Sequence, residues 1–153
     1  MHDISGTIDA IYIGSQKTIG PKNAPTGIFK DPIESAYLTT QGLRGDVQAD
    51  RRVHKKKKKA LYHYPADNYS VLKQALPTIG DSFIPGSIGE NLSSKDIDDS
   101  QIHIGDILKI GETLVQVSQP RRPCWKVNYK YGDSNVASLL MSQEICGWYY
   151  RVL

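Results

Sequence analysis

Cysteine is scarce in this chain of 153 residues, which contains only Cys124 and Cys146. Small secreted proteins that depend on disulfides use cysteine far more densely, so the composition argues against a disulfide framework and favours a reducing compartment. The sequence also lacks any run close to the roughly 18 apolar residues that a membrane-spanning helix requires. Residues 1–6 carry neither the basic region nor the apolar run of a secretory signal. We therefore expect a cytoplasmic protein that does not associate with membranes.

Recognisable cofactor motifs are absent as well. No flavin, haem or nicotinamide motif occurs in the chain, no lysine-centred site for pyridoxal phosphate can be recognised, and no internal repeat is visible. A chain of this length can bury a core of its own without further domains. We therefore expect a single domain over residues 1–153, and any electrons used in redox chemistry would have to come from a separate protein.

Positive charge is concentrated in one segment although the net charge is only +3. Arg51, Arg52 and the lysines at 55–59 place seven cations within nine residues. Such a cluster attracts anions, which include a cofactor phosphate, a nucleic acid and an acidic protein, or it remains a solvated loop. Nucleic acid is the weaker of these interpretations, because no aromatic residues alternate with the lysines and no recognition motif accompanies them.

The apolar pattern predicts many short strands and few helices. The clearest prediction is a hairpin, in which residues 106–110 pair with residues 113–118 across a Gly111-Glu112 turn. Further strands are expected over residues 4–13, 34–40 and 147–153. Residues 60–64 are expected to form a strand or the approach to a helix. Helices are expected over residues 66–76, with Pro65 in the first turn, and over residues 136–141. These elements predict a mainly β fold, a barrel or sandwich with small helical insertions.

Cys124 is the strongest candidate for a functional residue. The cations Arg121, Arg122 and Lys126 surround it in the sequence, and they stabilise a thiolate, which is the nucleophilic and metal-binding form of cysteine. A cysteine is more often a small residue of the core, and we expect that role for Cys146, which has no basic neighbours. The prolines and cations around Cys124 instead favour a loop at the end of a strand, where functional residues concentrate.

Several separated motifs match one family pattern, and their order spans most of the chain. They are Gly42-Leu43-Arg44-Gly45-Asp46-Val47-Gln48-Ala49-Asp50, Val53-His54, Lys59-Ala60-Leu61, Tyr64-Pro65, Gly89-Glu90-Asn91-Leu92, Ile104-Gly105-Asp106, Val117-Ser118-Gln119-Pro120-Arg121, Pro123-Cys124, Lys126 and Gly147-Trp148. With these motifs the chain resembles the MOSC domain, named for the C-terminal part of molybdenum-cofactor sulfurase, and especially its small bacterial YiiM-like members. The resemblance implies a mainly β fold, a MOSC-type β-barrel of mixed strands with a few short helices.

The resemblance also implies binding of the molybdenum cofactor (molybdopterin), with Cys124 as the catalytic residue and the protein ligand of the metal. A soft thiolate suits this metal, and the phosphate of the pterin needs cations or N–H donors. The residues expected around the cofactor are Arg121, Arg122, Lys126, His54, Lys59, Glu90 and Asn91. Three of them have a structural alternative: His54 as a hydrogen-bonding scaffold, and Glu90 and Asn91 as parts of a turn.

The lysine-rich segment departs from the family pattern. The family histidine is usually followed by two glycines, a variable residue, an aspartate and a basic residue, whereas lysines fill all five positions here and only Lys59 matches. Either this loop is remodelled to hold a phosphate electrostatically, or the site is impaired. YiiM-like proteins also commonly continue into a small helical extension, which we expect this chain, ending at Leu153, to lack.

Two functions follow from the resemblance. The first is a molybdenum-dependent oxidoreductase that reduces N-hydroxylated compounds, such as hydroxylamino purines, to amines with electrons from a separate reductase. The second is a non-catalytic domain that binds the cofactor or carries sulfur as a persulfide on Cys124. MOSC domains also occur beside a pyridoxal-phosphate sulfurase domain, which fits the carrier function.

Overall fold

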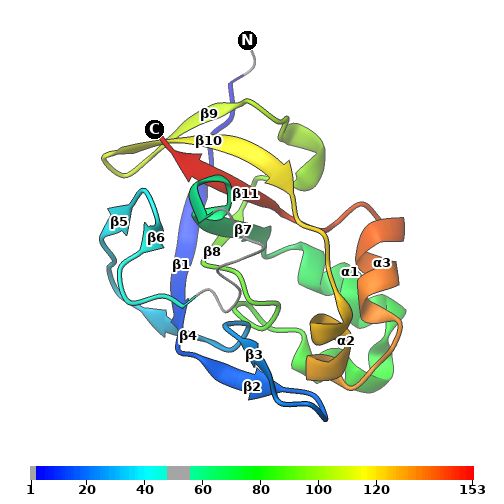
Figure 1. The fold of residues 1–153 in the computed structure, drawn as a ribbon. Coiled ribbons are helices and arrows are strands. Elements are labelled where there is room, and N and C mark those ends of the chain that lie inside the picture. Colours follow the sequence, from blue (N-terminus) through cyan, green and yellow to red (C-terminus); the bar gives the residue numbers. More distant parts are fainter. Residues whose placement is uncertain (1–2, 48–55) are drawn as a thin grey trace.

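The computed structural model describes residues 3–47 and 56–153, and its main feature is a curled sheet of seven strands that resembles half of a barrel (Figure 1). The strand order is β4-β1-β8-β7-β11-β10-β9, and only the β7–β8 pair is parallel. The strands are β1 (Thr7–Gly14), β4 (Lys30–Ile33), β7 (Leu61–Pro65), β8 (Leu92–Lys95), β9 (Ile107–Ile110), β10 (Thr113–Pro120) and β11 (Trp148–Val152). The mainly β fold of mixed strands is therefore confirmed.

Short elements flank this sheet. Two small hairpins pair β2 (Lys17–Ile19) with β3 (Ala24–Thr26) and β5 (Leu38–Thr39) with β6 (Gly42–Leu43). The helices are α1 (Asn68–Ala75), α2 (Trp125–Tyr131) and α3 (Val136–Ser142), and the 3-10 turns are η1 (Lys56–Lys59), η2 (Pro77–Ser82) and η3 (Asp99–Gln101). The three helices gather on one side of the molecule, and α2 lies near the β2–β3 hairpin (Figure 1).

The predicted hairpin is confirmed, with β9 and β10 joined at Gly111, whose φ of +59° suits a tight turn. The predicted helices over 66–76 and 136–141 correspond to α1 and α3, and residues 60–64 form β7. The placement of Pro65 in a helix was wrong, because Pro65 pairs with Ser94 in the parallel ladder. Of the strand expected over 34–40, only the two residues of β5 are extended.

Helix α2 was missed by the sequence analysis, which expected a loop around Cys124. Cys124 is extended, with φ −121° and ψ −179°, and it precedes the first helical residue. The helix ends at Gly132, which adopts the left-handed conformation with φ +67°. Lys130 in the last turn and Gly132 after it are the signal that could have identified α2.

Two apolar clusters fill the interior. One cluster packs the helices against β7, with Tyr64, Leu72, Phe83 and Val127 among its members. The other lies along β10 and β11 and includes Trp148 and Tyr150, as expected for residues of the closing strand. Tyr149, between them, is only partly buried, and Cys146 is half-buried against the first cluster.

No helix in the described ranges combines the length and the apolar composition that a bilayer crossing requires.

Candidate functional site

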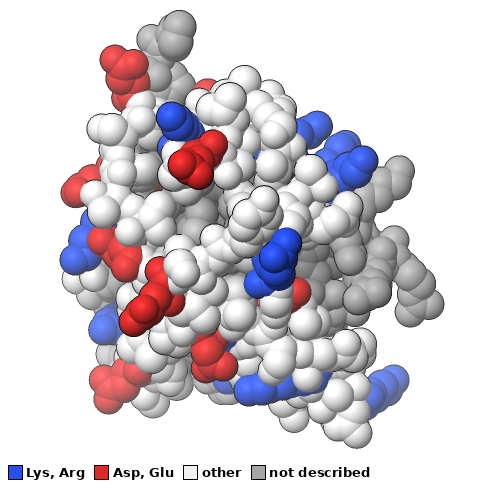
Figure 2. Space-filling model, turned by 90° about the vertical axis from the view of Figure 1, so that its left-hand side faces the viewer, with Lys and Arg blue, Asp and Glu red and all other residues white. Residues whose placement is uncertain are grey.

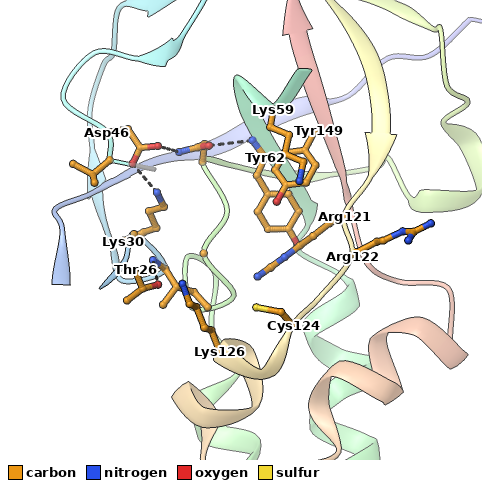
Figure 3. A pocket seen from close by; sticks show the side chains of 15 residues that line it. Thr26, Lys30, Asp46, Lys59, Tyr62, Arg121, Arg122, Cys124, Lys126 and Tyr149 are labelled. Atoms are coloured by element: carbon orange, nitrogen blue, oxygen red, sulfur yellow. Dashed lines mark hydrogen bonds and ion pairs between the residues drawn. The ribbon is translucent and has the colours of Figure 1, made fainter. Parts of the chain in front are cut away.

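A cavity of about 240 Å³ opens where the end of β10 and the start of α2 meet the loops that follow β3 and β6 (Figure 3). The fold brings residues from widely separated parts of the sequence to this cavity. Those expected from the sequence that line it are Lys59, Asn91, Arg121, Arg122, Cys124 and Lys126. His54 lies outside the described residues, and the Glu90 side chain does not line the cavity.

Cys124 presents a free, exposed thiol at this cavity. Its backbone carbonyl accepts a hydrogen bond from the N–H of Val127 at 3.1 Å, which begins the first turn of α2. The thiol lies next to Arg121 in the close view (Figure 3). The end of β10 and the beginning of α2 therefore hold the sulfur in a defined place, within reach of a ligand that enters from solvent.

Arg121 forms one wall beside the thiol. Its Nη1 donates to the carbonyl of Ile88 at 2.8 Å, and its guanidinium lies 4.6 Å from the centre of the Tyr62 ring. Burial by itself lowers the pKa of Arg121, but the neighbouring Tyr62, Tyr149 and Cys124 together hold it above its ordinary value. Arg121 therefore remains a fixed positive charge at the site.

The other expected cations differ in their surroundings. The Lys59 ammonium lies 5.3 Å from the centre of the Tyr149 ring, and partial burial together with the charge of Arg121 lowers its pKa. Lys126 Nζ donates to the carbonyl of Pro25 at 2.7 Å. Arg122 is exposed and points away from Cys124 (Figure 3). Lys59 and Lys126 thus contribute to opposite sides of the cavity, while Arg122 lies at its edge.

A buried network that the sequence analysis only partly expected forms the far wall. Asp46 Oδ1 accepts hydrogen bonds from Lys30 Nζ at 2.6 Å and from the N–H of Gly14 at 2.8 Å. Asp46 Oδ2 accepts from Asn91 Nδ2 at 2.9 Å. The side chains of Lys30 and Asp46 are only 6% and 5% exposed, so each charge depends on the other for compensation. The sequence analysis identified Asp46 only as part of a family motif, and Lys30 had no sequence signal that distinguished it.

Asn91 connects this network to the sheet. Its Oδ1 accepts from the N–H of Tyr62 at 3.0 Å, and its Nδ2 also donates to the carbonyl of Tyr12 at 3.2 Å. The turn alternative required the Asn91 amide to bond to its own backbone. The amide instead bonds to the backbone of β7 and β1. Contact between Asn91 and a cofactor stays a prediction.

Glu90 lies in the core behind the cavity, on the opposite side of the chain from Asn91. It is fully buried, and its Oε2 accepts from the Tyr69 hydroxyl at 2.6 Å. Burial raises the pKa of Glu90, although the hydrogen bond from Tyr69 opposes this effect. Consecutive residues project in different directions, so only one of Glu90 and Asn91 reaches the cavity, and a ligand would meet Gly89 in place of the Glu90 carboxylate.

Aromatic residues missed by the sequence analysis complete the wall near Lys59. Tyr62 and Tyr149 line the cavity, and their ring centres are 5.3 Å apart. The Tyr62 hydroxyl donates to the carbonyl of Cys146 at 2.7 Å. Alternation along β11 directs Tyr149 to the face of the sheet opposite that of its buried neighbours Trp148 and Tyr150.

Comparisons with known proteins agree with this architecture. The family model described as the MOSC domain matches residues 50–153. The chain is 38% identical over 144 residues to Protein YiiM of Escherichia coli, an alignment that covers 94% of this chain and 64% of YiiM. The crystal structure of YiiM from Geobacillus stearothermophilus matches 97% of this chain and 68% of that chain with a TM-score of 0.76 at 28% identity.

A more distant relative is a protein named Reductase from Gibberella moniliformis. It is 31% identical over 130 residues, which cover 84% of this chain and 23% of that protein. The chain spans less than two thirds of the length of E. coli YiiM.

Proposed function

Because the chain belongs to the MOSC domain family, we propose that the cavity at Cys124 binds the molybdenum cofactor and that the protein reduces N-hydroxylated compounds to amines. The observation that carries this proposal is the single exposed thiol at a cavity whose walls carry Arg121, Lys59 and Lys126. The fungal relative named Reductase supports the redox class, since a segment similar to this chain makes up 23% of it.

The donor set fits a metal that arrives with ligands of its own. No group of three or more His, Cys, Asp or Glu side chains suited to a metal ion occurs in residues 3–47 and 56–153. One thiolate alone would hold a free metal ion poorly, but it is sufficient for a metal already bound to the dithiolene of a pterin. The neighbouring cations match the phosphate of such a pterin.

In this proposal Cys124 Sγ holds the metal, and Arg121 keeps a positive charge beside it. Lys59 and Lys126 bind the anionic part of the cofactor from two sides. The chemistry that the cofactor supplies when bound is a two-electron reduction. Lys59 Nζ, with its lowered pKa, is suited to give up a proton at the cavity wall. The reaction consumes two electrons and two protons, cleaves the N–O bond and releases the amine and water, and the electrons come from a separate reductase.

The test is the molybdenum and pterin content of protein produced in a host that makes the cofactor. Wild type should contain both at near-stoichiometric amounts, and Cys124→Ala should lose them. The matched control is Cys146→Ala, which removes the other thiol of the chain and should retain both. Folded wild type without molybdenum or pterin would contradict the proposal, as would a Cys124→Ala variant that keeps its full content.

Protein that passes this test should then reduce a hydroxylamino purine when a reductase and its electron source are added.

The exposed thiol also allows a second function, in which Cys124 carries sulfur as a persulfide. A carrier would contain cyanide-labile sulfur that disappears in Cys124→Ala, and it would show no reduction with any electron donor.

A further inference from the structure

An exposed aromatic pair lies on α2, immediately after Cys124. Trp125 and Tyr129 are 51% and 54% exposed, and their ring centres are 6.4 Å apart with an interplanar angle of 82°. Trp125 also packs against the β2–β3 hairpin, where a methyl group added at Gly20 would lie 2.9 Å from its ring. Helix α2 and this hairpin therefore form one continuous surface next to the cavity, which we call the α2 surface. It comprises Lys17, Lys22, Trp125, Lys126, Tyr129 and Lys130.

This part of the protein is strongly cationic. Residues 15–30 and 120–132 together contain seven Lys and Arg and no Asp or Glu, although the whole chain has 19 basic and 16 acidic residues. By contrast, the face that carries β4, β5 and β6 mixes both signs (Figure 2). The only one of the seven cations with an ion pair in the described part of the chain is Lys30, which bonds to Asp46. The α2 surface therefore attracts an anionic partner.

Lys130 of α2 lies among other positive charges. Partial burial lowers the pKa of Lys130, Glu90 opposes this effect, and the charges of Arg121, Lys17 and Lys30 add to it, so that the pKa is about 8. Lys17 and Lys130 both lie over the Phe29 ring, at 5.4 and 5.3 Å from its centre. Like charges held this close repel one another, and an acidic partner relieves that repulsion.

We propose that the α2 surface docks an acidic redox protein that delivers electrons to the site at Cys124. This inference rests on the proposed function, in which each N–O bond reduced requires two electrons and the donor is oxidised by the same number. The chain has no motif for an electron-carrying cofactor of its own. Exposed Trp and Tyr side chains within a charged rim are typical anchors of protein interfaces, and here they lie next to the proposed metal ligand.

The geometry favours a protein over a nucleic acid. Lys126 Nζ and Lys130 Nζ donate to the backbone carbonyls of Pro25 and Ser87, so these ammonium groups are held against the protein. The rings of Trp125 and Tyr129 are nearly perpendicular, and successive bases cannot stack on both. The cationic field would then act mainly by steering, while the aromatic pair supplies the contact area.

The experiment measures binding of two acidic redox proteins, a plant-type ferredoxin and a flavodoxin, by titration calorimetry at low and moderate salt. At least one should bind, and its affinity should fall about tenfold or more between about 20 and 200 mM NaCl. Lys22→Glu and Tyr129→Ala should each weaken binding about three- to tenfold. The matched controls are Lys109→Glu and Ile107→Ala, which change an exposed charge and an exposed apolar residue on β9 and should bind as wild type does.

Three results would overturn the proposal. They are failure of both acidic proteins to bind at low salt, binding that Lys22→Glu and Tyr129→Ala leave unchanged, and tighter binding of a single-stranded oligonucleotide or anionic vesicles at the same surface. Calorimetry does not depend on molybdenum, so the result is separable from the test of cofactor content. Cofactor without docking would refute only the docking surface, whereas docking without cofactor would refute the electron-transfer role and the proposed function together.

Discussion

At the scale of single residues, His63 shows how burial decides what a titratable side chain can do. Only 1% of it is exposed, and its Nδ1 and Nε2 lie 2.9 and 2.6 Å from the Tyr150 hydroxyl and the Ser94 hydroxyl. Burial lowers the pKa of His63 to about 3. The neutral ring therefore connects β7, β8 and β11 as a structural hydrogen-bonding group.

We predict that His63 makes the protein sensitive to acid. In the unfolded chain its pKa is 6.5, so between pH 6.5 and 3 the unfolded state binds more protons and stability falls as the pH falls. Between pH 6.5 and 4.5 the free energy of unfolding of wild type should decrease by about 2 kcal/mol more than that of His63→Asn. Urea unfolding followed by fluorescence at both pH values measures this difference.

His103→Asn is the control, because the His103 side chain is 65% exposed, and it should follow the pH dependence of wild type. If His63→Asn and wild type lost stability in parallel, the assignment of acid sensitivity to His63 would be wrong.

At the scale of elements, Gly147 is the junction that places β11 against β7 and against the Cys124 segment. Its N–H donates to Asp99 Oδ1 at 2.7 Å, and its carbonyl accepts from the N–H of Arg121 at 3.0 Å. Its φ is +73°, and an added Cβ would lie 2.5 Å from the carbonyl oxygen of His63. The position therefore requires glycine for both conformation and space.

We predict that Gly147→Ala destabilises the protein by about 2 to 4 kcal/mol, because the backbone of β7 cannot move away without breaking its pairing with β11. Gly111→Ala is the matched control. Gly111 also has a positive φ, +59°, but nothing lies within 4 Å of an added Cβ, so the cost should be near 1 kcal/mol. The midpoints of urea unfolding give both values, and equal losses would contradict the role of the close approach.

At the scale of the whole molecule, charge is distributed unevenly between faces, and the two tryptophans sample different environments. Trp125 lies on the cationic α2 surface and is 51% exposed, whereas Trp148 is 3% exposed. Collisional quenching of tryptophan fluorescence therefore reports almost entirely on Trp125.

We predict that iodide quenches this fluorescence about two- to threefold more efficiently than caesium at low ionic strength, after each ion is normalised to its quenching of N-acetyltryptophanamide. The difference should shrink as NaCl is added, because salt screens the field. Trp125→Phe should remove most of the quenching by either ion. Equal normalised quenching by iodide and caesium would show that the α2 surface has no net positive potential.

The candidate site was predictable only in part. Cys124, Arg121 and Lys126 were identified because they lie close together in the sequence. Lys30 and Asp46 were not among the residues expected at the cavity, since they are 16 residues apart and meet only when β4 and the loop after β6 come together. The prediction for His54 falls outside the described residues.

The sequence by itself determined the local secondary structure and the reactive and charged side chains that are available to a site. Alternation and turn glycines specified the β9–β10 hairpin and the closing strand, and the cations around Cys124 marked its segment, because these signals act over a few residues. Only the tertiary structure decided which side chains face the cavity. It directed Asn91 toward the site and Glu90 into the core, and it exposed Trp125 on a cationic surface, because such outcomes depend on contacts between segments that are distant in the sequence.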